Sequence, residues 1–323
     1  TRTMKGVKQM RKFIIDTDTG SDDAVALMMA LLSDDVDVIG ITTVCGNAPL
    51  ECSTKNALMT VEVCGKRVPV YEGLAKPIMR DLVTAVNVHG NDGMGDLDLI
   101  HPFTLPQRMH AVDFMLETIG SNPDEIEIVA IGPVCNLAAA IIKDAATMKR
   151  VKRIWSMGTS GFGAGNTTPV AEFNVYADAE SYAILLQSGI PIMIIGFDLC
   201  LGPAALSITD IETWRSHSSV SRFAVECNTE LLNYNLKRSG EYMIDLPDAV
   251  AIGVALWDDI VLDSVSAYCY CCTTEPHTYG QVIIYDKSDV LAIEQITPPD
   301  NATVIRSIDH ALFKERMNAL ICG

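Results

Sequence analysis

The chain has 323 residues, of which 49% are hydrophobic and 20% are charged, a composition typical of globular proteins. Its 41 acidic residues outnumber its 24 Lys and Arg, and the net charge of -17 argues against a nucleic acid as partner, because the phosphate backbone is bound by clustered Lys and Arg. No apolar stretch approaches the roughly 20 residues of a membrane helix and no signal peptide is evident, so we expect a cytoplasmic protein with reduced cysteines.

Short apolar runs alternate with helical patterns from residue 12 to residue 196. Buried strands are predicted at residues 12–16, 36–44, 68–73, 126–132, 151–158 and 190–196. Helices are predicted between them, at residues 21–33, 51–65, 109–121, 133–144 and 178–189. Strands that alternate with helices and lack a period-2 pattern are typical of an open parallel sheet covered by helices on both faces.

The rest of the chain is predicted to be mostly helical. Helices are expected at residues 221–236, 248–257 and 311–321, and residues 264–272 and 280–286 are expected to pair as a small β-hairpin. There is no internal repeat and no linker, so we predict one α/β domain over residues 1–323 with a helical C-terminal part. Residues 1–10 are expected to be disordered or left over from cloning.

The segment DTDTGSDD, residues 16–23, follows the first predicted strand and opens the first predicted helix. Ligands of open parallel sheets bind at the carboxyl ends of the strands. A turn at Gly20 before an acidic helix N-terminus accounts for one or two of the four aspartates. A hard cation accounts for all of them, because Ca²⁺ takes roughly six to eight oxygen ligands. The lack of nearby His and Cys disfavours zinc. We interpret the segment as a metal site, with an acidic helix start as the alternative.

The pattern D-x-D-x-G-x-D-D after a first strand resembles the signature of the nucleoside hydrolases, the inosine–uridine-preferring family. Further segments continue the resemblance in order along the chain: TTVCGN (42–47), VHGNDGMGD (88–96), AIGPVCNLA (130–138), GNTTPVAEFNVYADAESY (165–182) and DLPDAVAIGVAL (245–256). The resemblance implies the nucleoside hydrolase fold, an open, mostly parallel α/β sheet. It also implies hydrolysis of the N-glycosidic bond of purine or pyrimidine ribonucleosides to ribose and a free base.

The same resemblance implies roles for individual residues. Ca²⁺ would be bound by Asp18, Asp23, Asp248 and the backbone carbonyl of Cys135, although the family usually has Thr at this last position. Asp18 would also be the general base for the attacking water. The ribose would be bound by a polar set with one methionine beside it: Asp22, Asn47, Met157, Asn166, Glu172 and Asn174. Carboxylates suit this chemistry, because departure of the base builds positive charge on the ribose ring.

One position departs from the family pattern. Family members often have His or Trp immediately before the last metal-binding Asp, and this chain has Pro247 there. Proline can neither donate a proton nor stack on a base. Assistance to the leaving base is therefore expected from His89, Tyr234 or Tyr242, with ordinary roles in a loop or on a helix surface as the alternative.

Two other function classes remain open. A phosphatase with a D-x-D nucleophile loop also places acid after its first strand and would use Mg²⁺, but it has no use for the segment at 165–174. A degenerate relative would bind a nucleoside or ribose without cleaving it, although a pure binder need not keep the complete acidic set. The resemblance further implies a homodimer or homotetramer and a place in nucleoside catabolism or salvage, and it leaves the preferred base open.

Overall fold

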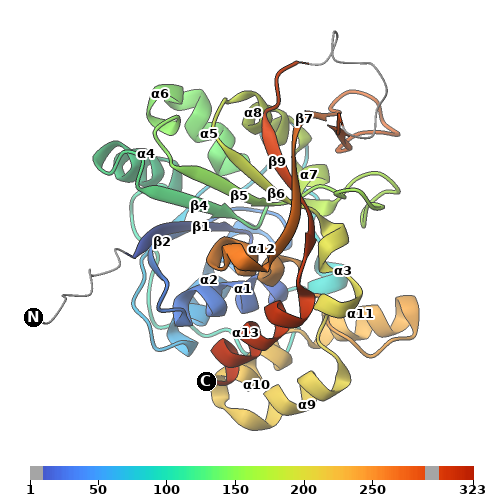
Figure 1. The fold of residues 1–323 in the computed structure, drawn as a ribbon. Helices are drawn as coiled ribbons and strands as arrows, with labels where there is room; N and C mark the ends of the chain where they lie inside the picture. The colour runs from blue at the N-terminus through green and yellow to red at the C-terminus, as the bar shows by residue number, and fades with distance from the viewer. Residues whose placement is uncertain (1–9, 288–297) are drawn as a thin grey trace, which may run out of the picture.

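The computed structural model describes residues 10–287 and 298–323 and contains a nine-stranded sheet with helices on both faces (Figure 1). The strands lie in the order β3-β2-β1-β4-β5-β6-β9-β7-β8. Neighbouring strands are parallel except for β7, which runs antiparallel to both β9 and β8. The predicted open, mostly parallel α/β architecture is confirmed. Residues 1–10 were expected to be disordered or left over from cloning, and of these only residue 10 is among the described residues.

The predicted strands and helices up to residue 196 are confirmed with small shifts at their ends. The strands are β1 (Arg11–Thr17), β2 (Val36–Thr43), β3 (Val70–Glu72), β4 (Ile126–Ala130), β5 (Arg153–Met157), β6 (Ile192–Ile195), β7 (Val261–Cys271), β8 (Val282–Tyr285) and β9 (Ala302–Ile308). The helices are α1 (Ser21–Leu32), α2 (Leu50–Val63), α3 (Val86–His89), α4 (Ala111–Ser121), α5 (Cys135–Lys143), α6 (Ala145–Met148), α7 (Phe173–Ala177), α8 (Ala179–Gln187), α9 (Ile208–His217), α10 (Ser219–Glu226), α11 (Thr229–Ser239), α12 (Pro247–Leu256) and α13 (His310–Cys322). None of the helices in the described ranges is long and apolar enough to cross a membrane.

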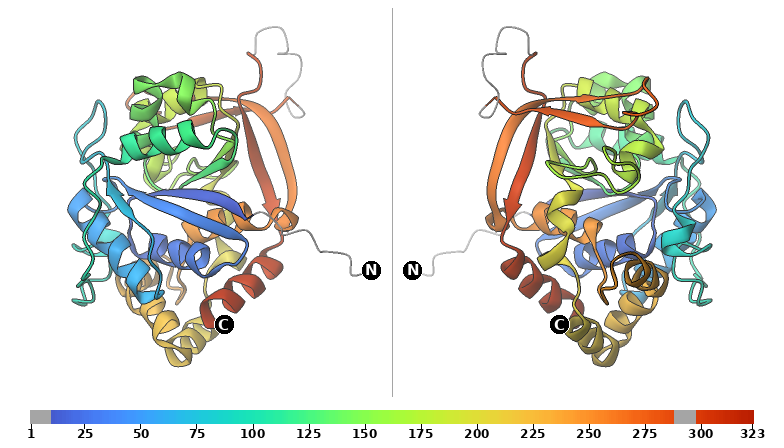
Figure 2. Two further views of the ribbon diagram at one scale, coloured as in Figure 1. Left: turned by 90° about the vertical axis from the view of Figure 1, so that its left-hand side faces the viewer. Right: turned by 90° about the vertical axis from the view of Figure 1, so that its right-hand side faces the viewer.

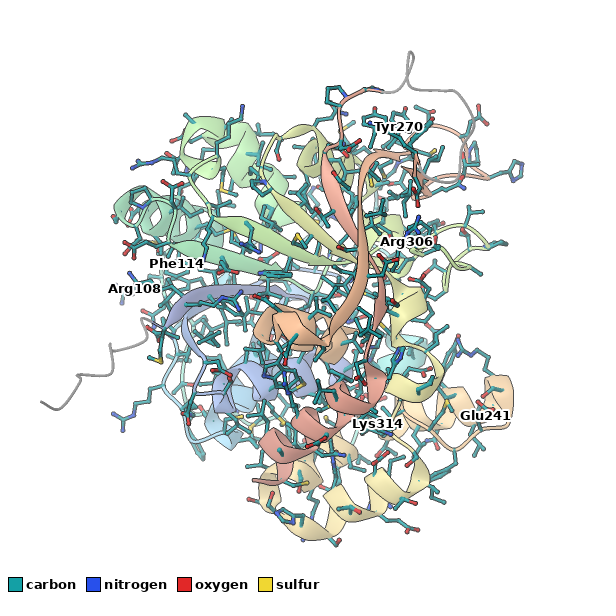
Figure 3. The ribbon with its side chains drawn as sticks, viewed as in Figure 1. Arg108, Phe114, Glu241, Tyr270, Arg306 and Lys314 are labelled. Carbon is teal, nitrogen blue, oxygen red and sulfur yellow. The ribbon has the colours of Figure 1, made fainter. Side chains whose placement is uncertain are left out.

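Two apolar cores lie on the two faces of the sheet. Phe13 and Ile15 point into one core together with α1, α12 and α13, whereas Ile14 points into the other with α4, α5 and α8. Figure 2 shows these two helical layers on opposite sides of the strands. Because both faces are covered, successive residues of a strand are all buried, which explains the continuous apolar runs in the sequence. Phe114 of α4, labelled in Figure 3, stacks on Tyr71 with ring centroids 3.8 Å apart.

The helix predicted at residues 221–236 is two helices. The break falls at Cys227 and Asn228, between α10 and α11. The Asn228 amide Nδ2 donates hydrogen bonds to the backbone oxygens of Ser21 and Ala224, each at 2.8 Å. A side chain that ties the chain to the first turn of α1 thus sets the start of α11, and the local helical pattern does not reveal such a distant contact.

The predicted hairpin is confirmed, because β7 and β8 pair antiparallel. Strand β9 was not predicted. It lies between β6 and β7, parallel to the first and antiparallel to the second. Its polar Thr303, Arg306 and Ser307 interrupt the apolar run that identified the other strands. The hairpin is therefore an extension of the main sheet.

The position of the site follows from the strand order. Strand β1 has β2 on one side and β4 on the other, so the chain reverses its direction of progress across the sheet at this point. The connections that leave β1 and β4 pass to different faces and open a crevice at their carboxyl ends. The segment 16–23 lies there.

Candidate active site

Asp16 lies near the end of β1, and hydrogen bonds hold one oxygen of its carboxylate. Its Oδ1 accepts hydrogen bonds from Thr42 Oγ1 at 2.6 Å and from Asn136 Nδ2 at 2.8 Å. Thr42 belongs to β2 and Asn136 to α5, so Asp16 ties the end of β1 to two neighbouring elements. Burial raises its pKa to about 7.

Asp23 in the first turn of α1 is held by neutral donors. Its Oδ1 accepts from Thr17 Oγ1 at 2.6 Å, and its Oδ2 accepts from the Gly20 backbone N–H and from Asn47 Nδ2, both at 2.9 Å. The carboxylate is thereby fixed in position without a positive partner. Burial, followed by the charge of Asp22, raises the pKa of Asp23 to about 6.

Asp22, Asp23 and Asp248 form a carboxylate cluster in which one oxygen of each lies within 4.8 Å of the others. Asp248 is in the first turn of α12, which packs against α1, so two helix N-termini bring the groups together. All three side chains are buried. Within residues 10–287 and 298–323, the basic side chain found beside the cluster is His89, whose Nδ1 lies 3.6 Å from Asp22 Oδ1. Burial and the neighbouring aspartates raise the pKa of Asp248 well above its ordinary value.

Asp18 adjoins this cluster, and its charge contributes to the raised pKa of Asp248. Its Oδ2 accepts from the Asn47 backbone N–H at 2.5 Å, whereas its Oδ1 is buried without a hydrogen-bond partner. Gly46 and Gly132 close around the carboxylate, because a Cβ atom at either position would overlap it. Burial and the charge of Asp23 raise the pKa of Asp18 well above its ordinary value.

This donor set fits a hard divalent cation. Asp18 Oδ1 and Asp22 Oδ1 are both buried without a hydrogen-bond partner within the described residues, and buried charges are strongly unfavourable unless they are paired or bind a metal. An all-oxygen set suits Ca²⁺ better than zinc. Of the predicted ligands, Asp23 and Asp248 belong to this cluster and Asp18 adjoins it. Cys135 begins α5 and is buried beside Cys45, and the role expected of its carbonyl stays a prediction.

A cavity of about 400 Å³ adjoins the carboxylates, a size suited to a small organic ligand. Most of the predicted substrate and leaving-group residues line it: Asp22, Asn47, His89, Met157, Asn166, Glu172, Asn174 and Tyr234, together with Asp248. Tyr242 does not line this cavity, and its side chain is 39% exposed. Asp18, Asp23 and Cys135 are fully buried and are not among the residues that line the cavity.

Glu172 is held in place by backbone donors at the start of α7. Its Oε1 accepts from the Asn174 N–H at 2.9 Å, and its Oε2 accepts from the N–H groups of Thr159 and Val175 at 3.2 and 3.3 Å. The carboxylate thus caps a helix and lines the cavity at the same time. Burial raises its pKa to about 7.

The two predicted asparagines near Glu172 are also oriented by backbone. Asn174 Nδ2 donates to the carbonyl oxygens of Ile131 at 3.0 Å and Met157 at 3.3 Å, at the ends of β4 and β5. Asn166 Oδ1 accepts from the Phe173 N–H at 2.9 Å. The segment 165–174 therefore presents amides and a carboxylate to one side of the cavity.

His89 ends α3 and is buried against the first turn of α1. Its Nδ1 lies 2.9 Å from Ser21 Oγ. Burial lowers the pKa of His89 to about 4, so the imidazole is neutral at neutral pH. A neutral imidazole carries one N–H, which limits His89 to a single donated hydrogen bond.

One wall of the cavity was only partly foreseen from the sequence. Leu231, Tyr234, Asn235 and Arg238 of α11 all line it, as does Asp245 from the segment before α12. The four helical residues are spaced i, i+3, i+4 and i+7, which places them on one face of the helix. That spacing is a sequence signal that groups them, whereas nothing local identifies Asp245.

Comparison with known sequences places these features in a family. Residues 13–315 match the family described as inosine-uridine preferring nucleoside hydrolase. The pyrimidine-specific ribonucleoside hydrolase RihB of Shigella flexneri is 34% identical over 235 residues, which cover 72% of this chain and 73% of the relative. RihB of Escherichia coli (strain SE11) is 38% identical over 192 residues, covering 59% of this chain and 61% of the relative.

The chain is also similar to a yeast protein and to solved structures. An uncharacterized protein of Schizosaccharomyces pombe is 40% identical over 190 residues, which cover 58% of this chain and 61% of that protein. The matches to the yeast and E. coli proteins thus span less than two thirds of their length. Among solved structures, the plant nucleoside hydrolase PpNRh1 superposes with a TM-score of 0.90 at 27% identity, covering 97% of this chain and 99% of the other. A purine-preferring ribonucleoside hydrolase from Gardnerella vaginalis gives 0.88 at 26% identity, covering 97% and 98%.

Proposed function

Because the chain belongs to the inosine-uridine preferring nucleoside hydrolase family, we propose that it hydrolyses the N-glycosidic bond of ribonucleosides to ribose and a free base, with Ca²⁺ as its cofactor. The observation that carries the proposal is the buried carboxylate cluster beside a polar cavity of about 400 Å³. Relatives are named as pyrimidine-specific and as purine-preferring, so both classes of base are candidates.

Asp18, Asp23, Asp248 and the carbonyl of Cys135 would hold Ca²⁺, with Asp22 beside them. When bound, the ion would keep the carboxylates ionised, bind sugar hydroxyls and lower the pKa of a water molecule. Asp22 and Asn47 line the cavity and can receive ribose hydroxyls. Glu172, Asn166, Asn174 and Met157 also line it and can hold the rest of the sugar.

Asp18 is suited to take the proton from the attacking water. Its Oδ1 has no partner, while its Oδ2 is fixed by the Asn47 N–H. As the base departs, the ribose ring becomes positively charged. Asp22 and Glu172 are fixed carboxyl groups on the cavity wall and can stabilise that charge.

Asp18→Asn should lower kcat by at least about 100-fold, the usual scale of general-base catalysis. The change keeps the shape of the side chain and removes its ability to accept the proton. With CaCl₂ at saturating concentration, ribose should still bind through Asn166, Glu172 and Asn174, which are unchanged. Steady-state rates and ribose titrations measure the two effects separately. A variant with near-native kcat would show that another group activates the water.

We further propose that a residue near the base assists its departure, because Pro247 cannot. His89 and Tyr234 line the cavity and can each donate a hydrogen bond. Tyr242 would have to approach from its exposed position, so it is the weaker candidate. An activated substrate such as p-nitrophenyl riboside needs no such help and should be cleaved faster than inosine or uridine.

The variants His89→Ala, Tyr234→Phe and Tyr242→Phe test this assistance on both kinds of substrate. A true donor should matter for the natural nucleosides and hardly at all for p-nitrophenyl riboside. Its loss should lower kcat on inosine by about 100-fold or more. If all three variants keep full activity on natural substrates, assistance by these residues is ruled out, and the ribose assignments are unaffected.

Release of reducing sugar from a panel of nucleosides, measured with added CaCl₂, tests the function itself. We expect ribose from at least one ribonucleoside and no phosphate from p-nitrophenyl phosphate. Phosphate release with Mg²⁺ would instead support the D-x-D phosphatase. Nucleoside binding without ribose release would support the non-catalytic alternative. The cytoplasmic location and the homodimeric or homotetrameric state stay predictions.

A further inference from the structure

We propose that Ser21 is a positioning residue for His89: its hydroxyl group holds the imidazole in the form that carries its hydrogen on Nε2, so that the ring can donate a hydrogen bond to the leaving base. The inference rests on the proposed function and deepens it, because it names the group that sets the donor state of His89. It starts from one contact between two buried side chains.

The contact joins the first turn of α1 to the end of α3. Ser21 Oγ lies 2.9 Å from His89 Nδ1, which is hydrogen-bond distance. The backbone holds both residues in place, since the His89 N–H donates to the Ala85 carbonyl at 3.0 Å and the Ser21 carbonyl accepts from Asn228 Nδ2 at 2.8 Å. His89 lines the cavity, whereas Ser21 is fully buried and does not. Ser21 can therefore act on a ligand only through the ring.

The hydroxyl group decides which ring nitrogen carries the hydrogen. Ser21 has one hydrogen to donate, and a buried donor that finds no acceptor is unfavourable. Within residues 10–287 and 298–323, His89 Nδ1 is the hydrogen-bond partner found for Ser21 Oγ. When the hydroxyl donates, Nδ1 is the bare nitrogen and the single hydrogen of the neutral ring is on Nε2. If Nδ1 donated instead, the hydroxyl hydrogen would be left without that acceptor.

Asp22 is the group that favours the opposite form. Its Oδ1 is 3.6 Å from His89 Nδ1 and has no hydrogen-bond partner within the described residues, so it attracts a hydrogen on Nδ1. That distance is too long for a hydrogen bond, whereas Ser21 Oγ is closer, at 2.9 Å. Removal of the Ser21 hydroxyl should therefore shift the hydrogen toward Nδ1 and Asp22.

The two forms of the ring offer opposite groups to a ligand. The ring nitrogens lie on either side of Cε1, so with Nδ1 facing Ser21 the nitrogen left for a ligand is Nε2. The base keeps the electron pair of the glycosidic bond as it departs, and a hydrogen on Nε2 can stabilise that pair. A bare Nε2 would repel it. Only one form of His89 can thus provide the assistance that Pro247 cannot.

The variant Ser21→Ala tests the inference on two kinds of substrate. It should lower kcat on inosine by about tenfold, the scale of one hydrogen bond, and change the rate on p-nitrophenyl riboside by less than about twofold. The activated substrate needs no donor, so its rate reports the metal and ribose parts of the site alone. A serine that merely supports the first turn of α1 would slow both substrates by one factor, and that result would overturn the inference.

A double-mutant cycle shows whether Ser21 acts through His89. In a His89→Ala background, Ser21→Ala should lower the rate on inosine no further, because the ring that it orients is gone. Additive losses would show that the two side chains act independently, against the inference. Ser33→Ala is the matched control, because Ser33 is a buried serine at the other end of α1 that does not line the cavity. It should leave the rates on both substrates unchanged.

Nitrogen NMR reads the form of the ring without turnover. The histidines are labelled with ¹⁵N, CaCl₂ is present, and the signals of His89 are those that His89→Ala lacks. A nitrogen that carries hydrogen is well separated in shift from a bare one. The unmodified protein should carry the hydrogen on Nε2, and Ser21→Ala should move part or all of it to Nδ1. A hydrogen on Nδ1 in the unmodified protein would overturn the inference.

The outcomes separate this inference from the proposed function. If no ribonucleoside is cleaved, the proposed function fails, and the spectrum still tells which nitrogen carries the hydrogen. If nucleosides are cleaved and His89→Ala keeps the full rate on inosine, the catalytic role of the Ser21 contact fails alone. Should Ser21→Ala not fold, as judged by its thermal unfolding, the spectrum of the unmodified protein decides the matter.

Discussion

Replacing Asp23 or Asp248 by alanine is expected to abolish both nucleoside cleavage and Ca²⁺ binding in a chain that still folds cooperatively. Each change removes a charged oxygen ligand from the carboxylate cluster, whose members lie within 4.8 Å of one another. A hard cation is held by the number and charge of such ligands, so the remaining set should bind it far more weakly. The sheet and both apolar cores do not depend on these side chains.

The two variants should differ in stability. Asp23→Ala leaves the donors of Thr17, Gly20 and Asn47 without their acceptor. Each unsatisfied buried donor costs about 1–3 kcal/mol, so this variant should unfold at a lower temperature. Asp248→Ala removes one charge from a crowded set of buried carboxylates, which makes it the cleaner test of metal binding.

Calorimetric titration with Ca²⁺ and thermal unfolding with and without the ion measure the effect. Ca²⁺ at a hundred times its Kd should stabilise the unmodified protein by about 2.7 kcal/mol. The variants should lose this gain. Asp37→Ala, which removes an exposed acid on β2, should keep it. If Asp23→Ala or Asp248→Ala still binds stoichiometric Ca²⁺ and turns over normally, the metal site has been misplaced.

Local sequence patterns identified the parts of the site that lie close together in the chain. Segment 16–23 follows a clear apolar strand, and the rule that ligands bind at the carboxyl ends of parallel strands put it at the crevice. The segment at 165–174 was found through its resemblance to the family, and its Asn166, Glu172 and Asn174 line the cavity. In both cases the residues that carry the function are neighbours in sequence.

Features that depend on distant contacts were not predictable in this way. Glu127 lies inside the apolar run of β4, where a charge is unexpected. Its carboxylate is buried beneath Arg11 of β1 and Lys152, and it also accepts from Trp155 Nε1 at 2.8 Å. Hydrogen bonds and charges of these partners outweigh desolvation and lower the pKa of Glu127 to about 2. No local pattern shows that β1 and the residue just before β5 supply these cations.

The break between α10 and α11 and the partnership of Arg238 with Asp245 have the same origin. Asn228 is fixed by the Ser21 carbonyl, more than two hundred residues away in the chain. Arg238 lies in α11 and Asp245 in the segment before α12, and the turn after α11 brings the two side chains to 3.6 Å. Periodicity identifies which residues share a face, whereas the fold decides what that face meets.

Ribonucleosides are expected to be cleaved about 10⁴-fold faster than 2′-deoxyribonucleosides, because a site built to bind a hydroxyl leaves its own polar groups unpaired when that hydroxyl is missing. Asp22 and Asn47 are buried polar residues on the cavity wall, and Asp22 Oδ1 has no hydrogen-bond partner within the described residues. The expected direction opposes intrinsic reactivity, since a 2′-hydroxyl withdraws electrons and disfavours positive charge on the ring. A preference for ribose must therefore come from the protein.

Initial rates on inosine and 2′-deoxyinosine measure this preference. The variant Asn47→Ala shows whether the Asn47 side chain contributes to the ratio of the two rates. The Asn47 side chain also donates to Asp23, so the variant should lower activity on both sugars, but the ratio between them should shrink only if Asn47 binds a hydroxyl. A purely supporting role would lower both rates by one factor. Equal rates on inosine and 2′-deoxyinosine in the unmodified protein would remove the hydroxyl-binding role from Asp22, Asn47 and the metal together, because each of them was assigned to the same end of the sugar.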